Sequence, residues 1–371
     1  MPHALSGDQS AASQWIGYAR FLLTQGDEAR SLAFAFPSPD HVLRAAETPM
    51  LRLWRRDVLE SVDKATLLPP ASWALPISDE DYSPLLAECS DAPCLLFGRG
   101  DASVLTKPAI AIVGSRQPSL DGCSLAEHFA HDLARAGFVI VSGLASGIDT
   151  AAHRGAIKAS GQTIAVVATG IDTTYPRSNR LLCEEIVNNG AVVSQFLPTS
   201  APKKHHFPRR NRTLSGLSLA TVVIEAGVPS GTLITATAAA EQGRDVFALP
   251  WSVNHRSGSG CLELLMDGAL LALKPIDVIR AVNWSHPYID VPDFDGQVPK
   301  DTADLAGLSG PTGNDAFDAL LAAMGDGYHS ADDLATALSL DIRAVHQALA
   351  QLEIDGQLAR HGHACWTRLR D

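Results

Sequence analysis

The chain has 371 residues, more than one hydrophobic core usually holds, so we expect two or more domains of roughly 150 residues. Hydrophobic residues make up 46% of it and charged residues 19%, which excludes a disordered polyelectrolyte and indicates a globular, soluble protein. The net charge of −12 excludes a protein that coats nucleic acid through its overall charge, so a polyanion must bind at a local basic surface.

Membrane spans, disulfides and metal sites are not indicated. No stretch approaches the roughly 18 apolar residues that cross a bilayer, and the N-terminus lacks a basic start and an apolar signal core. We therefore expect a cytoplasmic protein without membrane contact. The six cysteines include no C-x-x-C pair, so we expect reduced thiols and no metal site.

Residues 1–75 are predicted to form a small helical domain. Trp15, Ala19, Leu22 and Leu23 recur at helical spacing, and glycine and proline residues separate such groups.

Residues 76–284 are predicted to form an α/β domain. Six apolar runs alternate with helical segments: AIAIVG, FVIVSG, TIAVVATG, AVVSQF, ATVVIEA and DVFALP. Strands that are apolar at successive positions are covered on both faces, which indicates a parallel sheet between helices. The expected fold is an extended Rossmann-like, doubly wound and mostly parallel sheet.

The last two segments are predicted to be a linker and a winged helix. Residues 285–312 hold four of the prolines with five aspartates and no long apolar run, so we expect an acidic, extended linker. Residues 313–371 indicate three helices followed by a hairpin in LARHGHACWTRL, which is typical of a winged-helix domain.

The first predicted strand ends in Gly114, Ser115 and Arg116, where a doubly wound sheet binds anionic ligands at helix N-termini. The dinucleotide fingerprint G-x-G-x-x-G is absent, so a nicotinamide cofactor is disfavoured and we expect no cofactor. The alternative is a tight turn with a solvated Arg116.

Further small-residue turns are expected at the same edge of the sheet. The second strand leads into a second candidate anion cradle, and the loop at 170–179 adds an arginine. Asp149 is interpreted as a helix cap or a buried hydrogen-bonding acid rather than a general base. Residues of these turns predicted to bind DNA are Gly143, Ser146, Gly147, Arg177, Ser230, Gly231 and Thr232.

The segment KKHHFPRRNR at 203–212 is the strongest signal for a polyanion site. Five of its ten residues are Lys or Arg, and no Asp or Glu occurs from 186 to 224. Cations that follow phosphates and an aromatic side chain that stacks on a base are what single-stranded nucleic acid requires. The alternative is a solvated loop with Phe207 in the core. The candidate residues are Lys203, Lys204, Phe207, Arg209, Arg210, Asn211 and Arg212.

No catalytic constellation is found in the sequence. G-x-S-x-G, H-E-x-x-H, a Walker A loop and a set of His and Cys with metal spacing are all absent. We therefore expect a binding protein rather than an enzyme.

Six motifs, in order, closely resemble the DNA processing protein A (DprA/Smf) family between about residues 82 and 272: VGSRQPS, VSGLASGIDTAAHRGAI, ATGIDTTYPRSN, FPRRNRTLSGLS, EAGVPSGTLITA and EQGRDVFALP. The resemblance implies a homodimer that binds single-stranded DNA and loads the RecA recombinase during natural transformation, on strands coated by single-strand-binding protein.

The resemblance also implies site residues. The phosphate-gripping Gly-Ser-Arg falls on 114–116, the basic and aromatic DNA contact on Lys204 and Phe207, and a basic position after Tyr-Pro on Arg177. The chain departs from the family pattern at Ser194-Gln195, Pro250-Trp251 and 260–262.

Two other functions remain as alternatives. The sheet also resembles lysine-decarboxylase-like nucleotide phosphoribohydrolases, but Thr235 stands where their motif has its glutamate. A winged-helix transcription regulator is the second, although residues 313–371 hold nine acids and four arginines, a net charge of −5 that is unfavourable for duplex phosphates.

Overall fold

The protein divides into two compact units, Met1–Asp293 and Phe294–Asp371. The computed structural model describes residues 3–5, 9–44, 68–255, 257–286, 329–331, 334, 342–354, 358–361 and 365–368. Within these ranges, no helix combines the length and the hydropathy needed to cross a membrane.

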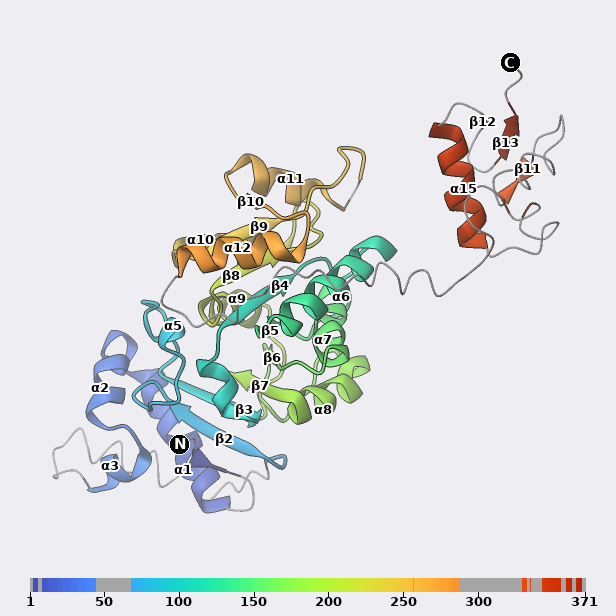
Figure 1. Cartoon of the computed structure of the whole chain (residues 1–371). Coiled ribbons are helices and arrows are strands. Elements are labelled where there is room, and N and C mark those ends of the chain that lie inside the picture. Colours follow the sequence, from blue (N-terminus) through green and yellow to red (C-terminus); the bar gives the residue numbers. More distant parts are fainter. Residues whose placement is uncertain are drawn as a thin grey trace. The chain divides into compact units, whose positions relative to one another are not determined.

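A ten-stranded sheet forms the centre of the first unit (Figure 1). Its order is β1-β2-β3-β7-β6-β5-β4-β8-β9-β10; the seven strands from β7 to β10 in this order are parallel, and β1, β2 and β3 pair antiparallel. The strands are β1 (His3–Ala4), β2 (Ser72–Pro76), β3 (Leu95–Gly100), β4 (Ala109–Val113), β5 (Val139–Ser142), β6 (Thr163–Val166), β7 (Gly190–Ser194), β8 (Ala220–Val223), β9 (Asp245–Ala248) and β10 (Leu270–Leu271).

The predicted parallel core is confirmed, because the six apolar runs form β4 to β9. All residues of β4, β5 and β8 are buried, as expected for strands covered on both faces. The chain starts this core at β4, adds β5, β6 and β7 on one side, and then crosses to β8 on the other. The topological switch point therefore lies between β4 and β8.

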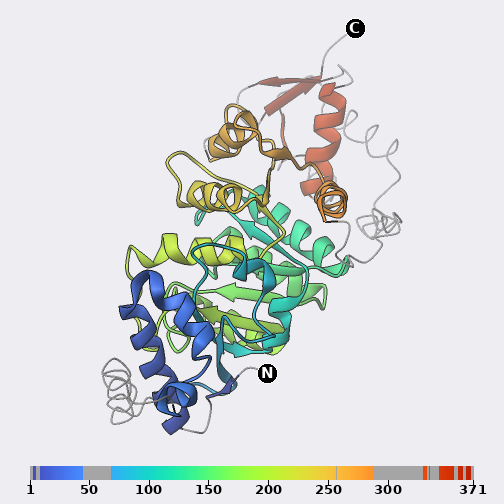
Figure 2. The same ribbon diagram turned by 90° about the vertical axis from the view of Figure 1, so that its left-hand side faces the viewer.

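Helices cover both faces of the sheet (Figure 1; Figure 2). Helices α6, α7 and α8 pack side by side on one face, and α9 packs against α10 on the other. The helices of this unit are α1 (Gln9–Thr24), η1 (Gly26–Glu28), α2 (Ala29–Ala35), α3 (Pro39–Arg44), α5 (Pro84–Ala87), η2 (Ala102–Thr106), α6 (Leu120–Arg135), α7 (Ile148–Lys158), η3 (Arg177–Asn179), α8 (Arg180–Asn189), α9 (His206–Gly216), α10 (Gly231–Glu241), α11 (Ser259–Met266) and α12 (Pro275–Ser285).

The N-terminal region joins this sheet through β1 and β2. The predicted boundary at residue 75 falls inside β2, which pairs with β3, and β3 pairs with β7. Trp73 fixes this pairing, because its indole lies on Gly98, where a Cβ would overlap the ring, and its Nε1 donates to the carbonyl of Gly100 at 2.9 Å. The predicted helices are present, since α1 to α3 occupy the described part of residues 9–44.

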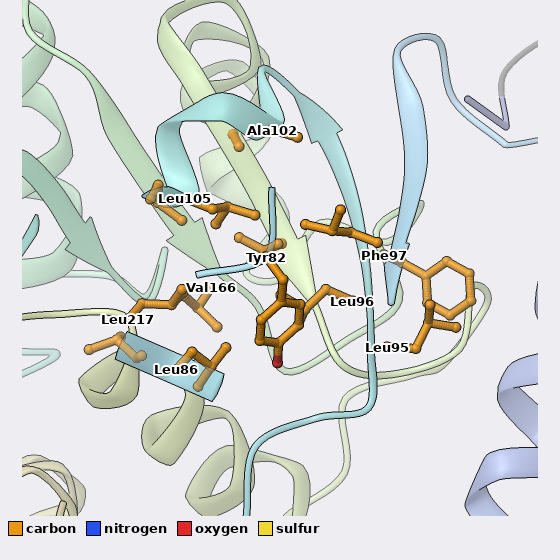
Figure 3. Close-up of a cluster of buried hydrophobic side chains, with 14 of the residues drawn as sticks. Tyr82, Leu86, Leu95, Leu96, Phe97, Ala102, Leu105, Val166 and Leu217 are labelled. Atoms are coloured by element: carbon orange, nitrogen blue, oxygen red, sulfur yellow. The ribbon is translucent and has the colours of Figure 1, made fainter. Parts of the chain in front are cut away.

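A continuous hydrophobic core joins the antiparallel strands to the parallel sheet. Figure 3 shows buried side chains from the turn before α5, from α5, β3, η2 and β6, and from the end of α9 that meet in one cluster: Tyr82, Leu86, Leu95, Leu96, Phe97, Ala102, Leu105, Val166 and Leu217. This packing makes β3 an extension of the Rossmann-like sheet and explains why the first unit does not divide near residue 75.

The second unit contains a three-stranded antiparallel sheet and one long described helix. Strand β13 (Cys365–Arg368) pairs with β12 (Leu358–His361) and with β11 (His329–Ser330), and α15 (Ile342–Ile354) packs against β12. The predicted hairpin is therefore confirmed. The predicted linker, apart from residues 285–286, and the first predicted helix of the tail lie outside the described residues.

Candidate nucleic-acid interface

A pocket of about 240 Å³ opens at the carboxyl ends of β4, β5 and β6, beside the start of α9. Four chain segments meet there, as expected for a ligand site of a doubly wound sheet. The lining residues are Arg116, Gln117, Gly143, Ala145, Ser146, Ala168, Thr169, Tyr175, Pro176, Phe207 and Arg210. The structure thus brings together five predicted site residues that are up to 94 positions apart in the chain: Arg116, Gly143, Ser146, Phe207 and Arg210.

Arg210 supplies a buried positive charge to this pocket. Its side chain projects from α9, the residue is 5% exposed, and its Nε has no hydrogen-bond partner among the described residues. A Cβ at position 143 would overlap Nη1 of Arg210, so only glycine leaves room for the guanidinium there. Burial lowers the pKa of Arg210, and nearby Asp149 opposes this effect.

Asp149 is the anionic neighbour of Arg210. It is buried, and its Oδ2 accepts a hydrogen bond from the amide of Ala145 at 3.3 Å. Burial raises its pKa, while Arg210 acts in the opposite direction. The interpretation as a buried hydrogen-bonding acid is confirmed. The interpretation as a helix cap is wrong, because Gly147, with φ +82°, is the N-cap residue of α7.

Arg116 and two aromatic rings form the rim of the pocket. The Cζ of Arg116 lies 5.0 Å from the ring centroid of Phe207, which is a cation–π distance. Tyr175 contacts Phe207 at a centroid separation of 6.1 Å and an interplanar angle of 63°. Because Phe207 is half-buried in the pocket wall, the alternative of a core side chain is wrong.

The other residues of the basic segment lie on different surfaces. Lys203 and Lys204 are exposed just before α9. Arg209 points toward Phe196, with its Cζ 5.9 Å from that ring centroid, and Asn211 donates to the carbonyl of Gly231 at 3.4 Å. Arg212 forms ion pairs with Asp91 and Glu241, so these carboxylates already occupy its guanidinium.

Arg177 and the turn after β8 also lie apart from the pocket lining. Arg177 borders a neighbouring cavity of about 840 Å³, together with Arg180. Ser230 caps α10 by accepting a hydrogen bond from the amide of Thr232 at 3.1 Å, and Gly231 is the first residue of that helix. Gly114, Ser115 and Gly147 shape the pocket loops without lining it.

Sequence reasoning missed several lining residues, of which Tyr175 is the most informative. Its signal was an aromatic residue followed by proline in the loop after β6, where only the arginine was singled out. Gln117, Ala145, Ala168, Thr169 and Pro176 have no chemical signature in the sequence, because their place depends on how the loops meet.

A Rossmann-like sheet with a cationic and aromatic pocket at the carboxyl ends of its strands is an arrangement that suits an anionic ligand such as a nucleic acid. The sequence matches the family described as DNA recombination-mediator protein A over residues 73–283, and the DprA winged helix domain over residues 305–362. The chain belongs to this DprA/Smf family of DNA-processing proteins.

Relatives and solved structures agree with this assignment. The chain is 45% identical to DNA processing protein DprA of Streptococcus pneumoniae over 55% of this chain and 72% of that protein, and 36% identical to protein Smf of Escherichia coli over 78% and 76%. An X-ray structure of the pneumococcal protein superposes with a TM-score of 0.60 at 35% identity, over 71% of this chain and 97% of that one. A Helicobacter pylori DprA structure, described as giving insight into single-stranded DNA binding, has a TM-score of 0.51 at 30% identity, over 56% and 95%.

Proposed function

We propose that the pocket and the adjoining basic segment bind single-stranded DNA with little sequence preference. The observation that carries this proposal is the arrangement of Arg116 on Phe207 above the buried Arg210. Two cations can hold phosphates while the aromatic rim stacks on a base, which contributes roughly 1–3 kcal/mol per base. The single-strand binding reported for the Helicobacter pylori relative supports the same ligand class.

The binding path extends beyond the pocket. Lys203 and Lys204 are exposed at the start of α9, and Arg177 borders the neighbouring cavity. These cations are placed to meet phosphates that flank the nucleotide in the pocket. We assign no DNA contact to Arg209, Asn211, Arg212 or the turn at 230–232, because their side chains serve other contacts or lie elsewhere.

A salt titration with short single-stranded oligonucleotides tests this site. Each lost phosphate contact reduces the log–log salt slope by roughly 0.7, so Arg116→Ala and Lys204→Ala flatten the slope. Phe207→Ala weakens binding at every salt concentration, because stacking releases no counterions. Parental affinity and slope in all three variants would place the site elsewhere.

We further propose that the protein is a recombination mediator of natural transformation. It holds incoming single strands that are coated by single-strand-binding protein and loads RecA onto them. Two DNA sites in a homodimer raise the local concentration of DNA and recombinase together. The parental protein is expected to speed RecA filament formation on coated strands, measured by RecA ATPase activity. Arg116→Ala is expected to speed it less than the parental protein does. Absence of stimulation by a parental protein that binds the DNA would reduce the role to single-strand binding.

The edge strand β10 supports a homodimer. It pairs only with β9 among the described strands, and Leu270, Leu271 and Leu273 are 42%, 50% and 61% exposed there. An exposed apolar edge can pair with another chain, and a second copy would supply the same surface by two-fold symmetry. Leu271→Glu is expected to give monomers in sedimentation velocity, whereas a parental protein that is itself monomeric would contradict the proposal.

We propose no enzymatic activity. Thr235 is buried within α10 at the position where the phosphoribohydrolase motif has its glutamate. Release of base from a nucleoside monophosphate by the purified protein would overturn this view.

A further inference from the structure

Glu225, two residues after the end of β8, is a buried carboxylate that the DNA site does not explain. It is 0% exposed, and it lies at the topological switch point between β8 and β4. Among the described residues, all hydrogen bonds that its carboxylate accepts come from Ser119. The Ser119 amide donates at 3.0 and 3.1 Å to the two oxygens, and the Ser119 hydroxyl donates at 2.6 Å.

Glu225 also holds the other end of the same loop. Its carbonyl accepts a hydrogen bond from the amide of Ser115 at 2.7 Å. One residue therefore fixes Ser115 through its main chain and Ser119 through its side chain, and Arg116 lies between these two anchors. The carbonyl of Ser115 in turn accepts from the amide of Ile148 at 3.1 Å, which ties the loop to α7.

The carboxylate lies against the N-terminus of α6, where this class of fold usually offers amides to an anionic ligand. A Cβ at Gly122, in the first turn of α6, would overlap Oε2 of Glu225. The Glu225 carboxylate therefore occupies the place at the N-terminus of α6 where an anionic ligand would otherwise bind. Arg116, in the same loop, reaches the ring of Phe207.

We propose that Glu225 is a positioning residue for Arg116: it clamps both ends of the 115–119 loop and thereby holds the Arg116 guanidinium on Phe207 in the DNA pocket. The DNA arm of the test rests on the proposed function, whereas the loop itself is measurable without DNA. Glu225→Gln is the informative change, because an amide of the same shape cannot accept from both Ser119 donors without turning its NH2 group toward one of them.

The first measurement is hydrogen exchange of the full chain without DNA. The amides of residues 115, 116, 117 and 119 are expected to exchange faster in Glu225→Gln than in the parent; Pro118 has no amide hydrogen. Val222→Ala is the matched control, because it removes buried methyl groups from the same strand without a hydrogen bond to the loop. Parental exchange of this loop in Glu225→Gln, or equal acceleration in Val222→Ala, would overturn the proposal.

The second measurement is a double-mutant cycle in the single-strand salt titration. Glu225→Gln is expected to reduce the log–log slope by about 0.7, as Arg116→Ala does, and the double variant should bind no more weakly than Arg116→Ala alone. Independent, multiplying losses, or an unchanged slope, would show that Glu225 does not act through Arg116. If Glu225→Gln does not melt cooperatively, Glu225→Asp carries the same cycle, since it keeps the charge but withdraws the carboxylate from Ser119. If the parent does not bind single strands, the proposed function fails while hydrogen exchange still decides the positioning role.

Discussion

Gly143 is the residue on which the geometry of the pocket floor depends most directly. Its missing side chain leaves the space that the buried Arg210 guanidinium occupies. Gly143→Ala forces that guanidinium to move, and we expect a loss of about 1–3 kcal/mol in the free energy of unfolding from overpacking. The displaced charge should also weaken single-strand binding at least about tenfold, which corresponds to 1.4 kcal/mol.

Urea denaturation and an oligonucleotide titration on the same protein check this prediction. Gly231→Ala is the control for stability, because a Cβ at that position meets no atom within 4 Å. Parental stability and affinity in Gly143→Ala would mean that Arg210 tolerates displacement and is not the floor of the site.

His153, buried on α7, is expected to make stability pH-dependent. The Thr163 hydroxyl donates to the carbonyl of Ile140 at 2.7 Å, so Nδ1 of His153 must be the donor in its 2.7 Å contact with Thr163. Burial, and then the charge of Arg210, lower the pKa of His153 to about 3. In the unfolded chain this pKa is about 6.5.

As the pH falls below about 6.5, His153 therefore binds a proton in the unfolded chain but stays neutral in the folded chain. Stability is fully present above that pH and is lost by about 1.4 kcal/mol per pH unit until about pH 3. In His153→Asn, which keeps a donor for Thr163 but does not titrate, denaturant midpoints between pH 6.5 and 4 should fall less steeply than in the parent. The exposed His128→Asn serves as the control, and equal pH slopes in all three proteins would refute the assignment.

At the scale of elements, the arginines of α9 have two different roles, one in the pocket and one in surface ion pairs. Arg210 enters the pocket, whereas Arg212 bridges Asp91 and Glu241 on another surface. These pairs are partly exposed and contribute no more than about 1 kcal/mol each. Arg212→Ala should therefore lower the free energy of unfolding slightly and leave the single-strand salt slope unchanged. Lys204→Ala should leave the free energy of unfolding unchanged and flatten the salt slope. A flattened slope in Arg212→Ala would show that Arg212 contacts DNA.

The same helix shows what sequence could and could not predict about the site. The acid-free window predicted where the positive charge gathers, because charge depends only on residue type. Arg209, Arg210 and Arg212 are identical in type, so their roles follow from the rotation of α9, which packing decides. Glu225 gave no signal as a positioning residue, since its partner Ser119 is 106 positions away.

The sheet shows a similar division. Strands β4 to β9 were predictable because burial on both faces leaves apolar residues at successive positions. Strands β1 and β10 are two residues long, and β2 ends in a proline, so no run of sufficient length marked them. Their membership in the sheet depends on tertiary contacts such as that of Trp73 with Gly98.

At the scale of the whole molecule, the pocket proposed to bind DNA belongs entirely to the first compact unit. All of its lining residues lie between 116 and 210, and the second unit begins at Phe294. Residues 313–371 carry nine acids and four arginines, a net charge of −5, so they repel rather than attract phosphates at long range. We therefore expect this unit to contribute little to single-strand affinity.

A chain that ends after Asp293 should accordingly keep the single-strand affinity and the salt slope of the full chain. The comparison is a titration of both proteins with the same oligonucleotide at three or more salt concentrations. Full-length Arg116→Ala, included in the same series, shows that the assay detects the loss of one phosphate contact, a slope change of roughly 0.7. A large loss of affinity in the shortened chain, with its thermal unfolding transition unchanged, would show that the winged-helix unit contacts DNA itself. Unchanged binding combined with lost stimulation of RecA would instead show that the winged-helix unit is needed for RecA loading and not for DNA binding.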